Sequence, residues 1–346
     1  MPLTPNVIER LFFLTLNQGP APMLDLWGGP AFHCVRAALK LGFFEALAGG
    51  PLTPEALAAK LQIDPRGTGI LLGTLEALGY VEPRGPAYQD SPMTRRWLLD
   101  SGELNLKPFY LYWGALLEHF LPHLEDSIRS GQPPVHLYEW IETQPEVSRD
   151  FQEGMIALAQ YVAKEVVQGV EVPQGATRLL DVGGGHGAYS LALCQAHPAL
   201  NATIFDSPQA LVTGRRAVQQ ASMEPQVTLM AGDFMRDELP GGFDLALVFN
   251  VLHGFLAPDN CELFRKIRQA LNPGGQIVIL EQIHGVSPLP LTSTAASLLS
   301  TAYFHLLGGQ VHTYQEIQAW LEETGFSQVR RKNILKASSA LIQASS

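Results

Sequence analysis

Two patterns of apolar and polar residues divide the chain. Up to about residue 101, apolar residues recur at helical spacing, as in AFHCVRAALKLGFFEALAGG over residues 31–50. From residue 178 onward, short apolar runs alternate with amphipathic stretches, beginning with RLLDV over residues 178–182. The first pattern predicts short helices. The second predicts an α/β domain in which helices cover both faces of a parallel sheet.

Helix-start signals recur within the N-terminal part. Thr53 precedes Pro54 and Asp64 precedes Pro65, so each pair supplies a capping side chain followed by a proline at the first helical position. A short hairpin is predicted around residues 83–86, within YVEPRGPAYQDSP. Short helices followed by such a hairpin have the layout of a winged helix.

Winged helices often bind DNA, but the charge of this chain argues against that function. The segment in the position of a recognition helix, residues 64–79, has Arg66 as its one basic residue, which is too little charge to neutralise several phosphates. The full chain of 346 residues carries a net charge of −10 with neutral His. We therefore expect a dimerisation and substrate-capping module, with no nucleic-acid partner and no membrane partner.

The middle of the chain predicts two long helices, over residues 106–134 and 148–170. His119 and His123 lie one turn apart in the first helix. Pro122 lies between them and no H-E-x-x-H motif surrounds them, so no metal site is expected. The predicted domains are a helical winged-helix-like domain over residues 1–101, linking helices that line the substrate pocket over residues 102–175, and a catalytic domain over residues 176–346.

The C-terminal part predicts alternating strands and helices. Strands are predicted over residues 178–182, 202–206, 227–233, 244–252, 276–282, 327–335 and 339–345. Helices are predicted over residues 186–198, 207–221, 258–275 and 313–326. Because the ligands of such sheets bind at the carboxyl ends of the strands, polar residues at those ends are the candidate site residues.

Cysteine content and the first residues indicate a compartment. Cys34, Cys194 and Cys261 are few, scattered and odd in number, which is typical of a reducing compartment without disulfides. The start, MPLTPNVIERLFF, lacks the features of a signal peptide, and no apolar window is long enough to span a bilayer. We expect a cytoplasmic protein.

A glycine loop follows the first predicted strand. The stretch LLDVGGGHGAYSLAL, residues 179–193, places Asp181 at the strand end, and Gly183 and Gly185 let the backbone approach a ligand closely. Asp206 closes the next strand, where a carboxylate can accept hydrogen bonds from ribose hydroxyls. These features suit a dinucleotide and S-adenosylmethionine (SAM) equally.

The remaining strand ends favour SAM. Asp233 and Phe234 follow the third strand and offer a carboxylate for an adenine amine and a ring for stacking. His253 and Glu281 follow the next two strands. Acids recur at these strand ends, and no Arg or Lys is positioned for a pyrophosphate. The site therefore suits the sulfonium cation of SAM better than a dinucleotide. The candidate cofactor-binding residues are Asp181, Gly183, Gly185, Asp206, Ser207, Asp233, Phe234 and Asn250.

Several motifs then identify a family. DVGGGHG, FDSP, GDF, FDLALVFNVLH, LNPGG and ILE occur in the order and spacing of class I SAM-dependent methyltransferases, which the sequence resembles. LGFFEAL, LTPEALAAKL and LLGTLEALGYVE resemble the dimerisation domain of the small-molecule O-methyltransferases of the caffeate, acetylserotonin and bacterial polyketide type. The resemblance implies a Rossmann-like SAM domain, a homodimer with interlocked N-terminal helices, and a small-molecule acceptor.

The resemblance also implies roles for individual residues. His253 matches the general base of the family's L-H-D-W motif, and Glu281 matches one of two carboxylates that orient this base. Met155, in FQEGM, matches a methionine beside the acceptor. The residues predicted to line the acceptor pocket are Met155, Phe151, Tyr112 and His305.

Three positions depart from the family pattern. Gly254 and Phe255 stand where the family has Asp and Trp after the catalytic His. Val311, in GGQVHT, stands where the second orienting Glu occurs in GG-x-E-R-T, and His312 follows it. At most one carboxylate, that of Glu281, is therefore predicted to orient the base. A more acidic acceptor, or a nucleophilic ring carbon, would depend less on such a base.

The sequence therefore predicts transfer of the SAM methyl group to a hydroxyl of an aromatic or polyketide-like molecule. The departures leave C-methylation, or a reaction that uses SAM without methyl transfer, as alternatives. A ligand-binding winged-helix regulator and an NAD-dependent oxidoreductase are more remote alternatives, carried by the N-terminal layout and by the loose glycine pattern.

Overall fold

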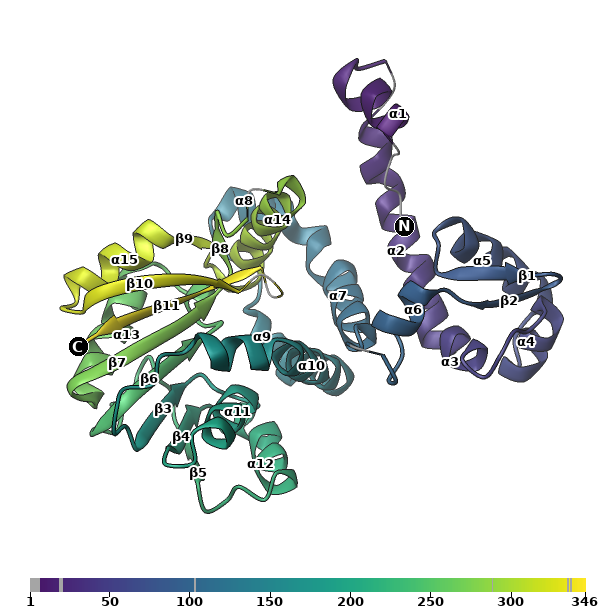
Figure 1. Ribbon diagram of the computed structural model, residues 1–346. Helices are drawn as coiled ribbons and strands as arrows, with labels where there is room; N and C mark the ends of the chain where they lie inside the picture. Colours follow the sequence, from purple (N-terminus) through teal and green to yellow (C-terminus); the bar gives the residue numbers. More distant parts are fainter. Residues whose placement is uncertain (1–6, 19–20, 103, 288, 335, 337) are drawn as a thin grey trace. The chain divides into compact units, whose positions relative to one another are not determined.

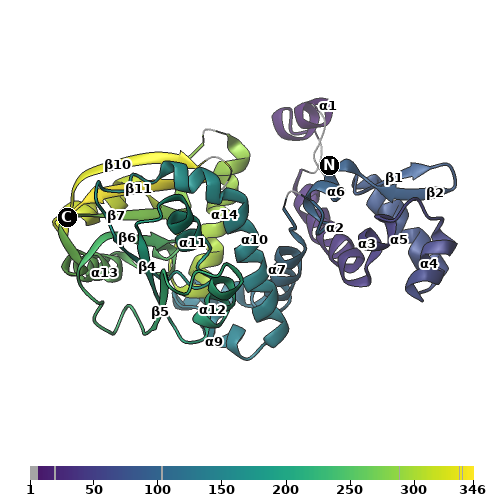
Figure 2. The same ribbon diagram turned by 60° about the horizontal axis from the view of Figure 1, so that its bottom comes forward.

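The computed structural model describes residues 7–18, 21–102, 104–287, 289–334, 336 and 338–346. The chain divides into two compact units, Met1–Glu118 and His119–Ser346. Each unit is shown in Figures 1 and 2 and is described by itself. The three-part division at residues 101 and 175 remains a prediction.

Within its described residues, the first unit consists of helices and one hairpin. Its helices are α1 (Val7–Arg10), the π-helical η1 (Leu11–Thr15), α2 (Pro22–Leu41), α3 (Phe43–Leu47), α4 (Pro54–Leu61), α5 (Pro65–Ala77), α6 (Pro92–Trp97) and α7 (Lys107–His119). The hairpin strands are β1 (Val81–Arg84) and β2 (Ala87–Asp90), paired antiparallel. The predicted hairpin is confirmed, with the turn between Arg84 and Ala87.

The local sequence explains where these helices begin and end. The Thr53 hydroxyl accepts the Ala56 N–H at 3.2 Å, and the Asp64 carboxylate accepts the Gly67 N–H at 2.7 Å, so both predicted caps are confirmed. The helical pattern of residues 31–50 is broken at Gly42, which adopts φ 77° and separates α2 from α3.

The helix predicted over residues 106–134 is interrupted in the structure. The α7 helix ends at His119, a 3₁₀ turn η2 covers Leu121–His123, and α8 (Leu124–Ser130) follows. Pro122 lacks the N–H that a continuous α-helix would require, which accounts for the break.

The second unit contains a seven-stranded sheet within the described residues. Its strands are β3 (Arg178–Val182), β4 (Asn201–Asp206), β5 (Val227–Ala231), β6 (Phe243–Phe249), β7 (Leu271–Glu281), β10 (Ser327–Ile334) and β11 (Ser339–Ser345). They lie in the order β10-β11-β7-β6-β3-β4-β5. The short strands β8 (Ile283–His284) and β9 (His312–Thr313) pair separately in parallel.

The sheet is mixed rather than entirely parallel, which corrects the prediction. β11 runs antiparallel to both β7 and β10, whereas the other neighbouring strands pair in parallel. The link between Ile334 and Ser339 is too short for a helical crossover, so β11 must return antiparallel to β10. The predicted helix over residues 258–275 is also shorter in the structure, since α13 (Ala257–Ala270) ends where β7 begins.

Helices cover both faces of this sheet, as Figures 1 and 2 show. One face carries α13 and α15 (Tyr314–Glu323), and their buried residues form one apolar core with the sheet. The other face carries a second core with the helices α10 (Pro145–Gly169), α11 (Ala188–Ala196) and α12 (Ala210–Gln220). The helices α9 (Leu137–Glu142) and α14 (Pro290–Leu307) complete the unit. This arrangement leaves the carboxyl ends of the parallel strands to form a site.

None of the helices in the described parts of the chain is long and apolar enough to cross a membrane.

Asp90 generates a prediction about stability. Its side chain is 2% exposed, and neither carboxyl oxygen has a hydrogen-bond partner among the described residues. Burial raises the pKa of Asp90 from 3.8 to about 7, with Arg95 lowering it and Glu45 raising it further. Because the folded state binds this proton more tightly than the unfolded state, the resulting stabilisation is complete below pH 3.8 and is lost as the pH rises through about 7.

Replacing Asp90→Asn should remove this pH dependence, because the amide cannot ionise. We expect the unfolding temperature of the wild type to fall relative to that of the variant as the pH rises from about 4 to about 7, by several degrees in all, and the difference to stay constant above about pH 8. Thermal unfolding followed by circular dichroism measures both. The exposed Asp100→Asn is the matched control. A difference between the Asp90 variant and the wild type that stays constant with pH would contradict the prediction.

Candidate active site

The glycine loop after β3 has the backbone conformation that glycine permits. Gly183 has φ 73° and Gly187, which caps α11, has φ 71°. A Cβ atom on Gly183 would lie 2.7 Å from Cγ2 of Val251. Side chains are therefore excluded here by both conformation and space, and the backbone is left open to approach by a ligand.

The Asp181 side chain packs against the glycine loop and supports it. Its carboxylate is buried and accepts the Ser190 hydroxyl at 2.6 Å, and a Cβ atom on Gly184 would lie 2.4 Å from it. Burial raises the pKa of Asp181 to about 7, while the Ser190 hydrogen bond lowers it and Asp206 raises it. The supporting contact is not visible in the sequence. The contact with the cofactor that the sequence suggested remains a prediction.

Asp206, at the end of β4, joins the glycine loop to the next helix. Its two oxygens accept the Gly185 N–H at 2.8 Å and the Ser207 N–H at 2.7 Å. Burial raises its pKa, and these two hydrogen bonds lower it. The Ser207 hydroxyl in turn accepts the Ala210 N–H at 3.3 Å at the start of α12.

A cavity of about 360 Å³ opens beside Asp206. The Lys266 ammonium donates to the Phe234 carbonyl at 2.7 Å and so holds the rim. The Asp233 carboxylate accepts the Met235 N–H at 2.9 Å. The lining residues are Asp206, Ser207, Pro208, Ala231, Gly232, Asp233 and Phe234. They include two acids, a hydroxyl and an aromatic ring, a set that suits the ribose and base of a nucleoside. Arg236 Nε lies 3.5 Å from Oδ2 of Asp233.

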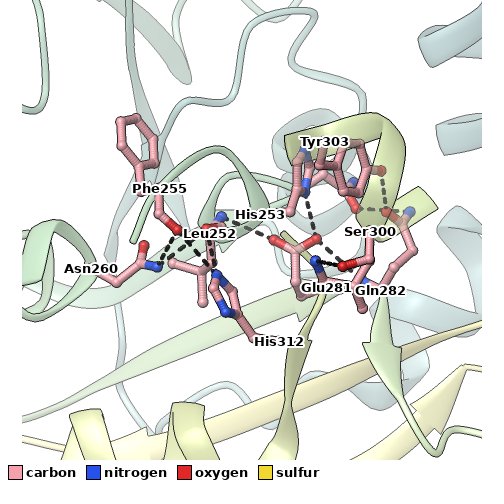
Figure 3. Close-up of polar contacts among 11 residues, drawn as sticks. Leu252, His253, Phe255, Asn260, Glu281, Gln282, Ser300, Tyr303 and His312 are labelled. Carbon is pink, nitrogen blue, oxygen red and sulfur yellow. Dashed lines mark hydrogen bonds and ion pairs between the residues drawn. The ribbon is translucent and has the colours of Figure 1, made fainter. Parts of the chain in front are cut away.

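His253 and Glu281 form a buried pair at the ends of neighbouring strands (Figure 3). His253 lies in the 3₁₀ turn η3 (Leu252–Gly254) after β6, and Glu281 ends β7. The histidine Nδ1–H donates to Oε1 of Glu281 at 2.7 Å, and the other oxygen, Oε2, accepts the Leu252 N–H at 2.9 Å. Glu281 is 0% exposed. With Nδ1 protonated, the neutral ring has its lone pair on Nε2, where it can accept a proton.

Two side chains hold the backbone carbonyls of the loop that carries His253. His312 Nε2 lies 3.1 Å from the carbonyls of both Leu252 and Phe255, and it must be the donor because carbonyls only accept. The Asn260 amide donates to the same two carbonyls, at 3.1 and 3.3 Å. Asn260 was missed in the sequence, where its one signal is a polar residue on the buried face of α13.

Val311, which departs from the family pattern, is buried in the structure. Val311 is 3% exposed, and its N–H donates to the Ser300 hydroxyl at 3.2 Å. The next residue, His312, donates to the carbonyls of Leu252 and Phe255 in the loop rather than to the His253 ring. A residue that the sequence did not indicate, Tyr303, stacks on His253, with ring centroids 4.0 Å apart.

The four residues predicted to line the acceptor pocket occupy different settings. Phe151 and Met155 lie one turn apart on α10 and are half-buried, and the Phe151 ring contacts Tyr138 with centroids 6.2 Å apart. His305 is buried, accepts the Ser127 hydroxyl at 2.8 Å and donates to the Phe120 carbonyl at 2.7 Å, so both ring nitrogens are engaged. Tyr112 is buried in α7 of the first unit. Their contact with an acceptor remains a prediction.

Two protein families match the chain. Residues 118–327 match the O-methyltransferase domain, and residues 29–100 match the O-methyltransferase dimerisation domain. Together these matches include the cavity, the His253–Glu281 pair and most of the first unit.

Individual relatives agree with this assignment. The chain is 31% identical over 327 residues to the tetracenomycin polyketide synthesis 8-O-methyltransferase TcmO of Streptomyces glaucescens, covering 90% of this chain and 93% of that protein. It is 28% identical to acetylserotonin O-methyltransferase of Mus musculus, covering 89% and 84%. The crystal structure of human N-acetylserotonin methyltransferase in complex with SAM is similar, with a TM-score of 0.81, 25% identity and coverage of 100% and 99%.

The strand order, the glycine loop with its acidic cavity, and the family matches agree with one another. The chain belongs to the O-methyltransferase family and is a SAM-dependent O-methyltransferase.

Proposed function

We propose that this enzyme transfers the methyl group of SAM to a hydroxyl of an aromatic or polyketide-like small molecule, with His253 as the general base. The observation that carries the proposal is the 2.7 Å contact between His253 Nδ1 and a fully buried Glu281 carboxylate. This contact fixes the tautomer whose Nε2 accepts a proton. The named activities of the two relatives support an acceptor of this class.

The hydroxyl oxygen of the acceptor loses a proton and gains a methyl group. Bound SAM supplies a methyl group on a sulfonium, which leaves as S-adenosylhomocysteine when the carbon–sulfur bond breaks. The acceptor oxygen forms its bond to that methyl while His253 Nε2 takes the hydroxyl proton. The imidazolium that forms is stabilised by the charge of Glu281, whose second oxygen is held by the Leu252 N–H.

The glycine loop and the cavity hold the cofactor in this proposal. Asp206 would accept hydrogen bonds from the ribose hydroxyls, and the backbone at Gly183 and Gly185 would hold the methionine part. Asp233 and Phe234 would bind the adenine. Ser207 and Asn250 would complete the cofactor site, and Asp181 supports the glycine loop.

The acceptor site and the assembly are proposed from the same family assignment. Met155 and Phe151 line the acceptor pocket together with Tyr112 and His305. The protein is a homodimer formed through its dimerisation domain, and it acts on small molecules rather than on nucleic acid. The apolar side chains exposed on α1, η1 and α2 fit a surface that a second copy covers; they include Val7, Ile8, Leu11, Phe12, Leu14, Met23, Leu26 and Trp27.

The activity is tested by measuring release of S-adenosylhomocysteine from purified protein and SAM across phenols, catechols and hydroxyquinones. Mass spectrometry and NMR of each product then show which atom carries the methyl group. An O-methylated product supports the proposal. A ring-methylated product would instead support C-methylation, which the missing second carboxylate keeps as the second candidate, and it would overturn the proposed acceptor atom.

The base role predicts a specific kinetic defect. Replacing His253→Ala should lower kcat at least about tenfold, and by up to the about 10² to 10⁴ that a general base typically contributes, because the hydroxyl proton loses its acceptor. Affinity for SAM, measured by calorimetry, should stay nearly unchanged. Glu281→Gln should lower kcat in the same direction, since it keeps the shape but removes the charge that stabilises the imidazolium. Wild-type turnover in the His253 variant would remove this residue from the base role.

The cofactor role of Asp206 predicts a change in affinity for SAM. Replacing Asp206→Asn should raise the Kd for SAM on the order of tenfold, because an amide accepts fewer hydrogen bonds from a ribose diol than a carboxylate does. Calorimetric titration with SAM measures the effect. Glu224→Gln, an exposed acid on the link between α12 and β5, is the matched control. Unchanged SAM affinity in the Asp206 variant would contradict the proposed cofactor site.

A further inference from the structure

The His253 ring is held by a single hydrogen bond among the described residues. That bond, from Nδ1 to Glu281, fixes one ring atom and the tautomer. By itself this bond does not fix the tilt of the ring plane about the line between the two atoms. A contact on the face of the ring would restrain this motion.

Tyr303 supplies contacts that act on the plane of the ring. Its ring lies parallel to the imidazole, with centroids 4.0 Å apart and an interplanar angle of 16° (Figure 3). Any swing of the imidazole out of its plane would therefore drive it into the tyrosine ring. The stacked ring also presents its electron-rich face to the imidazolium that forms during proton transfer, which is a favourable cation–π arrangement.

The hydroxyl end of the Tyr303 side chain is itself held in place. Its hydroxyl donates to Oε1 of Gln282 at 2.7 Å, and the Gln282 amide reaches Oδ1 of Asn250 at 3.5 Å. Burial, together with the charge of Glu281, raises the pKa of Tyr303, so the hydroxyl keeps the proton that it donates. The Gln282 N–H also donates to Glu281 at 3.1 Å, so the tyrosine and the carboxylate share one support.

The helix that carries Tyr303 is fixed on both sides of this residue. One turn earlier, the Ser300 hydroxyl accepts the Val311 N–H at 3.2 Å. Two residues later, His305 connects α14 to Ser127 and to the carbonyl of Phe120. The stacking ring therefore projects from a rigid element, as positioning of a base to a fraction of an ångström requires.

We propose that Tyr303 is a positioning residue, which holds the plane of the His253 ring. The inference rests on the proposed role of His253 as the general base. It assigns the tyrosine no contact with the reacting atoms, so all of its effect on turnover passes through His253.

Two substitutions at Tyr303 separate stacking from the hydroxyl. Tyr303→Leu removes the ring and should lower kcat about tenfold, because the base spends less time in the productive orientation, while KM and the Kd for SAM change less than about twofold. Tyr303→Phe keeps the ring and should retain at least about a third of the wild-type kcat. Thr301→Val, on the exposed face of the same helix, is the control and should match the wild type.

A double-mutant cycle tests whether the effect passes through His253. In a His253→Ala background, Tyr303→Leu should cause no further loss of kcat, because the residue that it positions is gone. Equal losses in both backgrounds, or a wild-type kcat for Tyr303→Leu, would overturn the inference. Full activity of His253→Ala alone would overturn the proposed base as well, whereas a defective His253 variant beside a fully active Tyr303→Leu variant would overturn the positioning role only.

A third substitution leaves α14 untouched in case the leucine variant folds poorly. Gln282→Leu removes the acceptor of the tyrosine hydroxyl, and it should lower kcat about threefold in the wild type but not in a Tyr303→Phe background. Equal losses in these two backgrounds would overturn the inference. Thermal unfolding of every variant is measured alongside, so that a loss of kcat is not mistaken for a loss of folded protein.

Discussion

The buried carboxylate of Glu281 is the group on which the rest of the site depends. It is fully removed from solvent and accepts hydrogen bonds from His253, from the Leu252 N–H and from the Gln282 N–H. An ionised carboxylate in such a place is stable only if its oxygens are occupied by donors. The need to supply those donors fixes both the turn after β6 and the residue after β7, so one electrostatic requirement organises two strand ends.

The surrounding side chains are arranged to keep that turn from moving. His312 and Asn260 hold the carbonyls of Leu252 and Phe255, while the N–H of Leu252 points to Glu281. The peptide groups of the turn are thus restrained through both their donors and their acceptors. This arrangement places the rigidity in the backbone of the turn and leaves the histidine ring to be oriented separately.

The sequence predicted the parts of this architecture that arise from local patterns. Alternating apolar runs indicated the strands, and Thr53 and Asp64 indicated helix starts, because periodicity and capping depend on neighbouring residues. The antiparallel direction of β11 was not predicted, since an apolar run does not encode its pairing partner. Strand-end placement pointed to His253 and Glu281 as candidates. The bracing by Asn260 and the stacking by Tyr303 depend on contacts between distant segments, which one sequence does not display.

The position of β11 has a consequence for how the enzyme is made. Ala340 on β11 lies opposite Glu281 on β7, so the strand that carries the carboxylate gains its outer neighbour from residues 339–345, which follow every candidate site residue in the sequence. During synthesis, β7 would leave the ribosome with one edge unpaired, and β11 would later insert between it and β10. A chain stopped before residue 339 would contain every candidate site residue. It would still leave the outer edge of β7, the strand that ends in Glu281, unpaired and open to water. Completion of the sheet is therefore also completion of the site.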